Sequence, residues 1–202
     1  MITVHHLNQS RSKRVIWLLE ELQTPYEVVH HQRNPQTNLA PASLAAIHPL
    51  AKSPVIVDGE RTLCESGAVM EYLLDQTPQH SLRPAKSEPC YYDYLEWLHF
   101  AEGSLAMPVI INMIMKREER AGNKPLDGYI AKELALDFAY IEATLGRRDY
   151  FAGDRFTAAD IMMCMILEIA DAHGLLTDKA KTLAYLSKLQ GRDAYQKAAS
   201  FG

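Results

Sequence analysis

The segment NQSRSKR, from Asn8 to Arg14, places two serines among three cations directly before an apolar helical pattern. A hydroxyl here can cap the helix, belong to a phosphate loop, or donate to another anion at the helix N-terminus. The segment has no glycine that would let the backbone wrap around a phosphate, so the phosphate loop is the weakest reading. The cap and the other anion site both stay open on these residues alone.

The dipeptide Ser53-Pro54 stands at the entrance to a β-prone run, VIVD. Proline cannot donate to a ladder, so it belongs at a strand start or an edge. If the peptide bond is cis, the Ser53 N–H and C=O turn outward and can bind an extended, peptide-like ligand. Otherwise Pro54 only marks where the strand begins.

Glu65-Ser66 precedes a helical pattern over 67–76. Ser66 can serve as a simple N-cap. A helix N-terminus also offers free N–H groups to a carboxylate, and Glu65 beside it can receive an ammonium group. Such a pair would suit the α-carbon end of an amino acid.

The bulk composition excludes several classes of protein. Net charge is −4 with dispersed cations, so neither nucleic acid nor an anionic membrane surface is an expected partner. Eight histidines show neither HxxxH nor HExxH spacing, and no metal site is expected. Cys64, Cys90 and Cys164 are far apart, without CxxC, which favours a reducing, cytoplasmic setting. We expect neither a signal peptide nor a membrane-spanning run.

The spacing of hydrophobic residues divides the chain into two predicted domains. Residues 1–78 predict an α/β domain with a mixed four-stranded sheet, built from strands at 2–6 and 26–30, a hairpin over 54–65, and helices at 15–22, 41–47 and 67–76. A polar linker at 79–88 contains proline. Residues 89–202 predict an all-helical domain. The first helix, at 91–120, should be kinked at Pro108, and another should begin after a T-x-x-D capping box at Thr157–Asp160. The remaining helices are expected at 127–146, 183–190 and 193–200.

Four segments, NQSRSKRVIWLLEEL, HPLAKSPVIVDG, CESGAVMEYLL and FTAADI, together resemble the glutathione S-transferases, in order and across both domains. YLEWLHFAEGSLAMP is most similar to the bacterial and fungal transferases that include the yeast GTT enzymes. The resemblance implies a thioredoxin-like domain that binds glutathione, a helical domain that supplies most of an apolar pocket for an electrophile, and a homodimer.

The resemblance also assigns residues. It implies that the Ser53 backbone and Pro54 hold the cysteinyl part of glutathione, that Glu65 and Ser66 hold the γ-glutamyl part, and that Lys52 faces the glycine carboxylate. The family often has Gly-Lys-Val-Pro here, and Ala51 and Ser53 depart from that pattern. Alanine is unfavourable if this position needs a positive φ.

Ser10 stands four residues before Arg14, as the catalytic serine does in serine-type transferases, and is the expected thiolate donor. A free thiol has a pKa of about 8.5, and lowering it by about two units stabilises the thiolate by roughly 2.7 kcal/mol. One hydroxyl and a helix N-terminus suffice for this. Asn8, Ser12 or backbone N–H groups alone are the alternative donors, with Ser12 also read as a cap, and Arg11 is a further candidate contact.

By the same resemblance, His99 lies where related bacterial enzymes bring a polar group from the neighbouring subunit to glutathione; the alternative is an ordinary histidine on a helix face. Phe100, Met107 and Ile111 are the expected lining of the electrophile pocket. The predicted function is a cytoplasmic glutathione S-transferase with glutathione as cosubstrate and without metal or bound cofactor. The alternatives are a non-catalytic carrier or interaction protein of the same fold, or a glutathione-dependent isomerase, thiol transferase or peroxidase.

Overall fold

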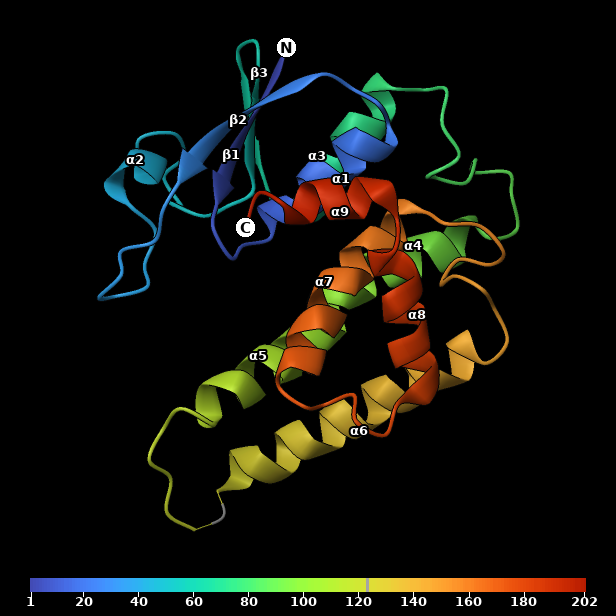
Figure 1. The fold of residues 1–202 in the computed structure, drawn as a ribbon. Coiled ribbons are helices and arrows are strands. Elements are labelled where there is room, and N and C mark those ends of the chain that lie inside the picture. Colours follow the sequence, from blue (N-terminus) through green and yellow to red (C-terminus); the bar gives the residue numbers. More distant parts are fainter. Residues whose placement is uncertain (123) are drawn as a thin grey trace. The chain divides into compact units, whose positions relative to one another are not determined.

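The computed structural model describes residues 1–122 and 124–202, which form two compact units (Figure 1). The first unit comprises Met1–His80 together with Gly191–Gly202, and the second comprises Ser81–Gln190. The sequence analysis gave every residue after 88 to the helical domain. The structure instead groups the C-terminal segment with the first unit, which no local pattern indicated.

The first unit contains a four-stranded sheet with the order β2-β1-β3-β4. Its strands are β1 (Ile2–Leu7), β2 (Tyr26–His31), β3 (Val55–Asp58) and β4 (Arg61–Cys64). β1 and β2 pair in parallel, and β3 pairs antiparallel with both β1 and β4. The predicted mixed sheet is confirmed, and Gly59, with φ of +58°, lies in the tight turn between β3 and β4.

Helices lie on both faces of this sheet. They are α1 (Ser12–Glu21), α2 (Ala42–Ala45), α3 (Ser66–Gln76) and α9 (Asp193–Ala199). His6 and His30 lie on the face reached by Phe201, just beyond α9, whereas His31 bonds Ser43 of α2 on the other face. The two faces of the sheet therefore carry different polar side chains, with His30 on the face of His6 and His31 and Ser43 on the opposite face.

The C-terminal helix α9 packs on α1. Arg192, which precedes α9, makes two hydrogen bonds to the Glu21 carboxylate, at 2.6 and 2.7 Å. Trp17 meets the ring of Tyr195 edge to face, with 5.1 Å between ring centroids. Packing on α9 agrees with the burial of α1 on more than one side, where Val15, Ile16 and Trp17 are all buried.

The second unit is all-helical, as predicted. Its helices are α4 (Tyr91–Phe100), the π-helix η1 (Ala101–Leu105), α5 (Ala106–Met115), α6 (Pro125–Leu145), α7 (Ala158–Ala172) and α8 (Ala180–Gln190). α7 packs against α4, η1, α5 and α8 and is buried around most of its circumference. It therefore forms the core of this unit.

The expected kink at Pro108 takes the form of the π-helix η1. Pro108 has no N–H, so the Ser104 carbonyl lacks its usual helical partner. In the preceding turn, the Ala106 N–H reaches back to the Ala101 carbonyl, five residues earlier. A π-turn widens the helix at this point without ending it.

The capping box that opens α7 is present as predicted. The Asp160 carboxylate accepts hydrogen bonds from the Thr157 N–H at 2.7 Å and the Thr157 hydroxyl at 2.9 Å. It also accepts the Phe151 N–H at 3.0 Å and the Tyr185 hydroxyl. Burial raises the pKa of Asp160, and these hydrogen bonds oppose that rise.

The run Tyr91–Met115 corrects one expectation, because it is long and apolar enough to cross a membrane by length and composition. The sequence reading found no such run. A third of its most apolar window is buried, and α4 and α5 pack against α7 within the helical unit. The same composition is typical of a core helix in a soluble protein.

Candidate functional site

Three loops emerge at the same edge of the sheet. β1 and β4 both run toward this edge and β3 runs away from it, since β3 is antiparallel to each of them. The register pairs His5 with Val55 and Val55 with Cys64. The loop after β1, the loop before β3 and the junction of β4 with α3 are therefore neighbours. These loops carry every site residue expected in the first unit.

Each of these loops holds a non-glycine residue with positive φ. They are Gln9 (+51°), Ala51 (+49°) and Glu65 (+74°). Such conformations are costly for residues with a Cβ atom, and they cluster where the surrounding structure serves a ligand or a reaction. Gln23 (+53°) and Asn38 (+57°) share this conformation elsewhere, but only here do three such residues lie on neighbouring loops.

In the first loop, Ser10 lies at the N-terminus of α1. Its Oγ accepts the Ser12 N–H at 3.3 Å, so Ser10 satisfies one N–H of the first turn. Ser12 is the first residue of α1, and its hydroxyl bonds Ser10 Oγ at 2.7 Å and His6 Nδ1 at 2.9 Å. Ser12 therefore does not act as the cap that its position suggested. Ser10 is 8% exposed and Ser12 is fully buried.

Asn8 and Arg11 have different surroundings. The Asn8 side-chain oxygen accepts the Arg33 N–H at 2.8 Å, and its carbonyl accepts Arg33 Nε at 3.2 Å. Asn8 thus joins the loop after β1 to the segment after β2. Arg11 occupies the N-cap position of α1, half-buried, without a side-chain cap bond.

In the second loop, the Ser53-Pro54 peptide bond is cis. The Ser53 hydroxyl donates to the His5 carbonyl at 3.0 Å, so the side chain of Ser53 is turned toward β1. Lys52 is exposed and Pro54 is buried at the start of β3. This arrangement leaves the Ser53 backbone, not its hydroxyl, as the group suited to hold a peptide-like ligand.

At the third loop, Glu65 takes the N-cap position of α3 and Ser66 is the first helical residue. The expected Ser66 cap is therefore absent, and the Glu65 side chain makes no cap bond either. N–H groups of the first turn of α3 are left without a side-chain cap, which suits them to a carboxylate. Glu65 itself is exposed.

Cys64 shows that the second and third loops meet. Burial and the nearby Glu65 carboxylate raise the pKa of the Cys64 thiol, and a backbone hydrogen bond from Glu65, followed by the Lys52 ammonium, partly opposes them. The charges of Lys52 and Glu65 therefore both act on Cys64. Opposite charges at this place fit the two ends of a zwitterionic ligand.

The candidates in the helical unit lie along α4 and α5. His99 is exposed in the last turn of α4, and Phe100 packs its ring against Trp97 at 5.0 Å between centroids. Met107 (38% exposed) and Ile111 lie one turn apart on one face of α5. The sequence reading missed a cavity of about 370 Å³ between α5 and α6, lined by Asn112, Met115, Lys116, Arg120, Asp127, Ile130, Ala131 and Leu134.

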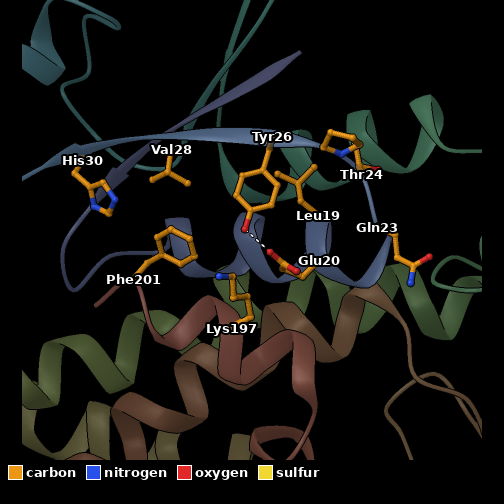
Figure 2. Close-up of a pocket in the computed structure, with 10 residues that line it drawn as sticks. Leu19, Glu20, Gln23, Thr24, Tyr26, Val28, His30, Lys197 and Phe201 are labelled. Atoms are coloured by element: carbon orange, nitrogen blue, oxygen red, sulfur yellow. Dashed lines mark hydrogen bonds between the residues drawn. The ribbon is translucent and has the colours of Figure 1, made fainter.

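A larger hollow in the first unit, of about 750 Å³, lies between β2, α1 and the end of α9. Figure 2 shows Tyr26, Val28 and His30 of β2 facing Phe201 and Lys197 across it, with the Tyr26 hydroxyl bonded to Glu20 at 2.5 Å. Its lining contains none of the site residues expected from the sequence. The three loops, which carry two helix N-termini and the expected site residues, are the better candidate site.

The sequence analysis did not predict two contacts between histidines of β1 and β2, His5 with His31 and His6 with His30. His5 Nδ1 lies 3.0 Å from His31 Nε2, and His31 Nδ1 lies 3.0 Å from the Ser43 hydroxyl. His6 contacts Ser12 on the opposite face. The adjacent pairs at 5–6 and 30–31 could have signalled this, because β1 and β2 are parallel. In the described part of the chain, no group of three metal-binding side chains occurs.

Comparison with known proteins gives the family. Residues 1–75 match the family model described as "Glutathione S-transferase, N-terminal domain", and residues 104–185 match "Glutathione S-transferase, C-terminal domain". The two matches fall in the two parts that the sequence analysis separated.

Relatives and a solved structure agree with these models. The chain is 38% identical over 180 residues to glutathione S-transferase 3 of Schizosaccharomyces pombe, covering 81% of this chain and 72% of that protein. It is 27% identical over 190 residues to glutathione S-transferase 1 of Saccharomyces cerevisiae, covering 84% and 81%. A crystal structure of a glutathione S-transferase from Actinobacillus pleuropneumoniae matches with a TM-score of 0.90 and 30% identity, over 99% of this chain and 92% of that one. This chain belongs to the glutathione S-transferase family.

Proposed function

We propose that this chain is an enzyme that conjugates glutathione to apolar electrophiles. One observation carries the proposal: a nearly buried hydroxyl, Ser10 Oγ, lies at the N-terminus of α1, in the loop beside the Ser53 backbone. A hydroxyl donor and the positive end of a helix both stabilise a thiolate. The cysteinyl part of glutathione, held at Ser53, would bring its sulfur to this point.

The other proposed contacts follow the charges of the peptide. The γ-glutamyl end carries an ammonium and a carboxylate, which match the exposed Glu65 and the N-terminus of α3 at Ser66. The glycine carboxylate matches the exposed Lys52. These contacts would position the thiol without taking part in the reaction.

The proposed reaction needs no bound metal or organic cofactor, because the thiolate is itself the nucleophile. A sulfur lone pair forms a C–S bond, and the bond to the leaving group breaks with its electron pair. Met107 and Ile111 of α5 are the proposed lining for the electrophile, with Phe100, and His99 is a further proposed contact to glutathione. We place the enzyme in the cytoplasm, where thiols are kept reduced.

Ser10→Ala tests this proposal. With chlorodinitrobenzene as electrophile, we expect kcat to fall about 10- to 100-fold, since a hydrogen bond to a charged group is worth about 1.5–3 kcal/mol. The dissociation constant for glutathione should change little, because the backbone and the two end groups hold the peptide. Ser87→Ala, at an exposed serine, is the matched control.

Each other outcome has a definite meaning. If Ser10→Ala retains full activity, Ser10 is not the thiolate donor. If the wild-type protein binds glutathione but conjugates neither this nor other electrophiles, the chain is a carrier or interaction protein. If it does not bind glutathione, the proposed site is wrong.

A further inference from the structure

Arg33, in the segment after β2, binds the loop that carries the proposed thiolate donor, Ser10. Its backbone N–H donates to the Asn8 side-chain oxygen at 2.8 Å, and its Nε donates to the Asn8 carbonyl at 3.2 Å. Its two terminal nitrogens donate to the Gln9 carbonyl at 3.3 Å and to the Asn38 carbonyl at 3.0 Å. One residue therefore holds both of the residues that precede Ser10.

The pairing of the first two strands brings these groups together. β1 and β2 are parallel, with Leu7 opposite His31, and the Asn8 N–H continues the ladder to the His31 carbonyl at 3.3 Å. Arg33 stands two residues beyond the end of β2, half-buried. A guanidinium carries its N–H donors in a rigid, planar fork, which lets one side chain bind several carbonyls at once. Because it only donates, the direction of each of its bonds is fixed.

Gln9 is the residue on which these bonds act most directly. Its φ is +51°, a conformation that a residue with a Cβ atom keeps only where the surrounding structure holds it. The Gln9 carbonyl accepts from Arg33, and the carbonyl of the preceding residue, Asn8, does so too. The fork is thus placed to hold the strained backbone immediately before Ser10.

Two properties of Arg33 could matter to a thiolate, namely its fork and its charge. All of its hydrogen bonds go to amide oxygens, and it makes no ion pair with any residue that the structure describes. The guanidinium therefore keeps a positive charge beside the loop, which would itself favour an anion. Lysine keeps the charge without the fork, so the two properties can be separated by substitution.

We propose that Arg33 is a positioning residue, whose fork holds Gln9 in the strained conformation that points the Ser10 hydroxyl at the sulfur of bound glutathione. This inference rests on the proposed function, and it adds what fixes the place of the donor. Arg33 acts through the backbone and touches neither glutathione nor the electrophile. Exact placement matters because a displacement of about 1 Å can cost roughly 100-fold in rate.

Three substitutions and a control separate this role from general support of the fold. Arg33→Ala removes the fork and the charge, and Arg33→Lys removes the fork alone. Gln9→Gly removes the strain, because glycine adopts a positive φ without steric cost. Arg192→Ala is the matched control, since Arg192 also makes two side-chain hydrogen bonds within the first unit, to Glu21 at the far end of α1 from Ser10.

The main measurement is the thiol pKa of bound glutathione, read from the ultraviolet absorbance of the thiolate, together with kcat and KM. We expect Arg33→Ala and Arg33→Lys both to raise that pKa by about one unit and to lower kcat about tenfold near neutral pH, with the KM for glutathione within about twofold. Arg192→Ala should leave the pKa and kcat near wild type, whatever it does to stability. If Arg33→Lys keeps the wild-type pKa and only Arg33→Ala raises it, the charge acts and the fork does not, which overturns the inference.

The strained residue supplies a second comparison. In a Gln9→Gly background the positive φ no longer has to be enforced, so Arg33→Ala should lower kcat only about threefold instead of tenfold. An equal loss of kcat in both backgrounds would show that Arg33 does not act through Gln9.

NMR couplings that report the sign of φ test the contact itself, in the protein without ligand. The expected result is a positive φ at Gln9 in wild type, lost or averaged in Arg33→Ala and in Arg33→Lys. A positive φ kept in both variants overturns the inference whether or not the enzyme proves active. If wild type forms the thiolate, Ser10→Ala loses it and both Arg33 variants keep it, the inference fails while the proposed function stands. If wild type forms no thiolate, the proposed function fails, and the inference with it.

Discussion

At the scale of single residues, the site is marked by backbone conformations that a sequence cannot display. Gln9, Ala51 and Glu65 all have positive φ, and none is glycine. For Ala51, the resemblance to a family that often has glycine there raised the question. For Gln9 and Glu65, the residue type did not indicate a positive φ. The hydrogen bond between Ser12 and His6 could not be read from the sequence either, because it depends on how β1 turns into α1.

Ala51→Gly tests the strain in the second loop. A residue with a Cβ atom at this φ costs the folded state about 1–2 kcal/mol, and glycine avoids this cost. Glycine also increases the conformational entropy of the unfolded chain, which lowers the free energy of unfolding by roughly 0.4–1 kcal/mol. We therefore expect the free energy of unfolding to rise by up to about 1 kcal/mol, measured by urea denaturation. Ala135→Gly, at an exposed position inside α6, should instead lower it by about 1 kcal/mol. An equal loss in both variants would contradict the strain argument.

At the scale of elements, local sequence signals predicted the helices and turns well, whereas packing between segments far apart in the sequence could not be predicted. The T-x-x-D box, the hairpin and the helical periodicities each depend on residues a few positions apart. The placement of α9 depends on Arg192 meeting Glu21, far away in the sequence. The sequence predicted a short helix there, but no sequence pattern indicated that this helix belongs to the first unit. The π-helix before Pro108 was likewise missed, since a proline signals a break and not its form.

Asp160→Ala tests the cap of the central helix. Its carboxylate accepts from two backbone N–H groups and two hydroxyls in a fully buried place, so the variant leaves those donors unsatisfied. We expect a loss of about 3–5 kcal/mol in unfolding free energy, measured by denaturant titration, or failure to fold. Asp127→Ala removes the corresponding residue from the exposed cap of α6 and should cost far less. Similar losses in the two variants would show that burial is not what makes Asp160 important.

At the scale of the whole molecule, the order of motifs was enough to predict the fold class, because each motif fixes one element of a known arrangement. The oligomeric state is harder to predict, because it depends on which side chains are exposed on the surface. Five large hydrophobic side chains of α4 and α6 are exposed, namely Tyr92 (76%), Leu136 (56%), Tyr129 (50%), Leu126 (40%) and Tyr140 (40%). Tyr129, Leu136 and Tyr140 repeat at helical spacing, which aligns them on one face of α6.

We propose that this face of α6 lies in a homodimer interface, since an apolar stripe of this length is uncommon on a monomer. The Tyr140 hydroxyl bonds Glu96 of α4 at 2.5 Å and so joins the two helices on one surface. Sedimentation should give about twice the chain mass of 22.8 kDa for wild type. Leu136→Lys should give the monomer mass, because a lysine pair in a buried interface is costly. Ile114→Lys, on α5 and 47% exposed, should leave the dimer intact. A dimer that survives Leu136→Lys would place the interface elsewhere, and a monomeric wild type would remove the dimer from the proposal altogether.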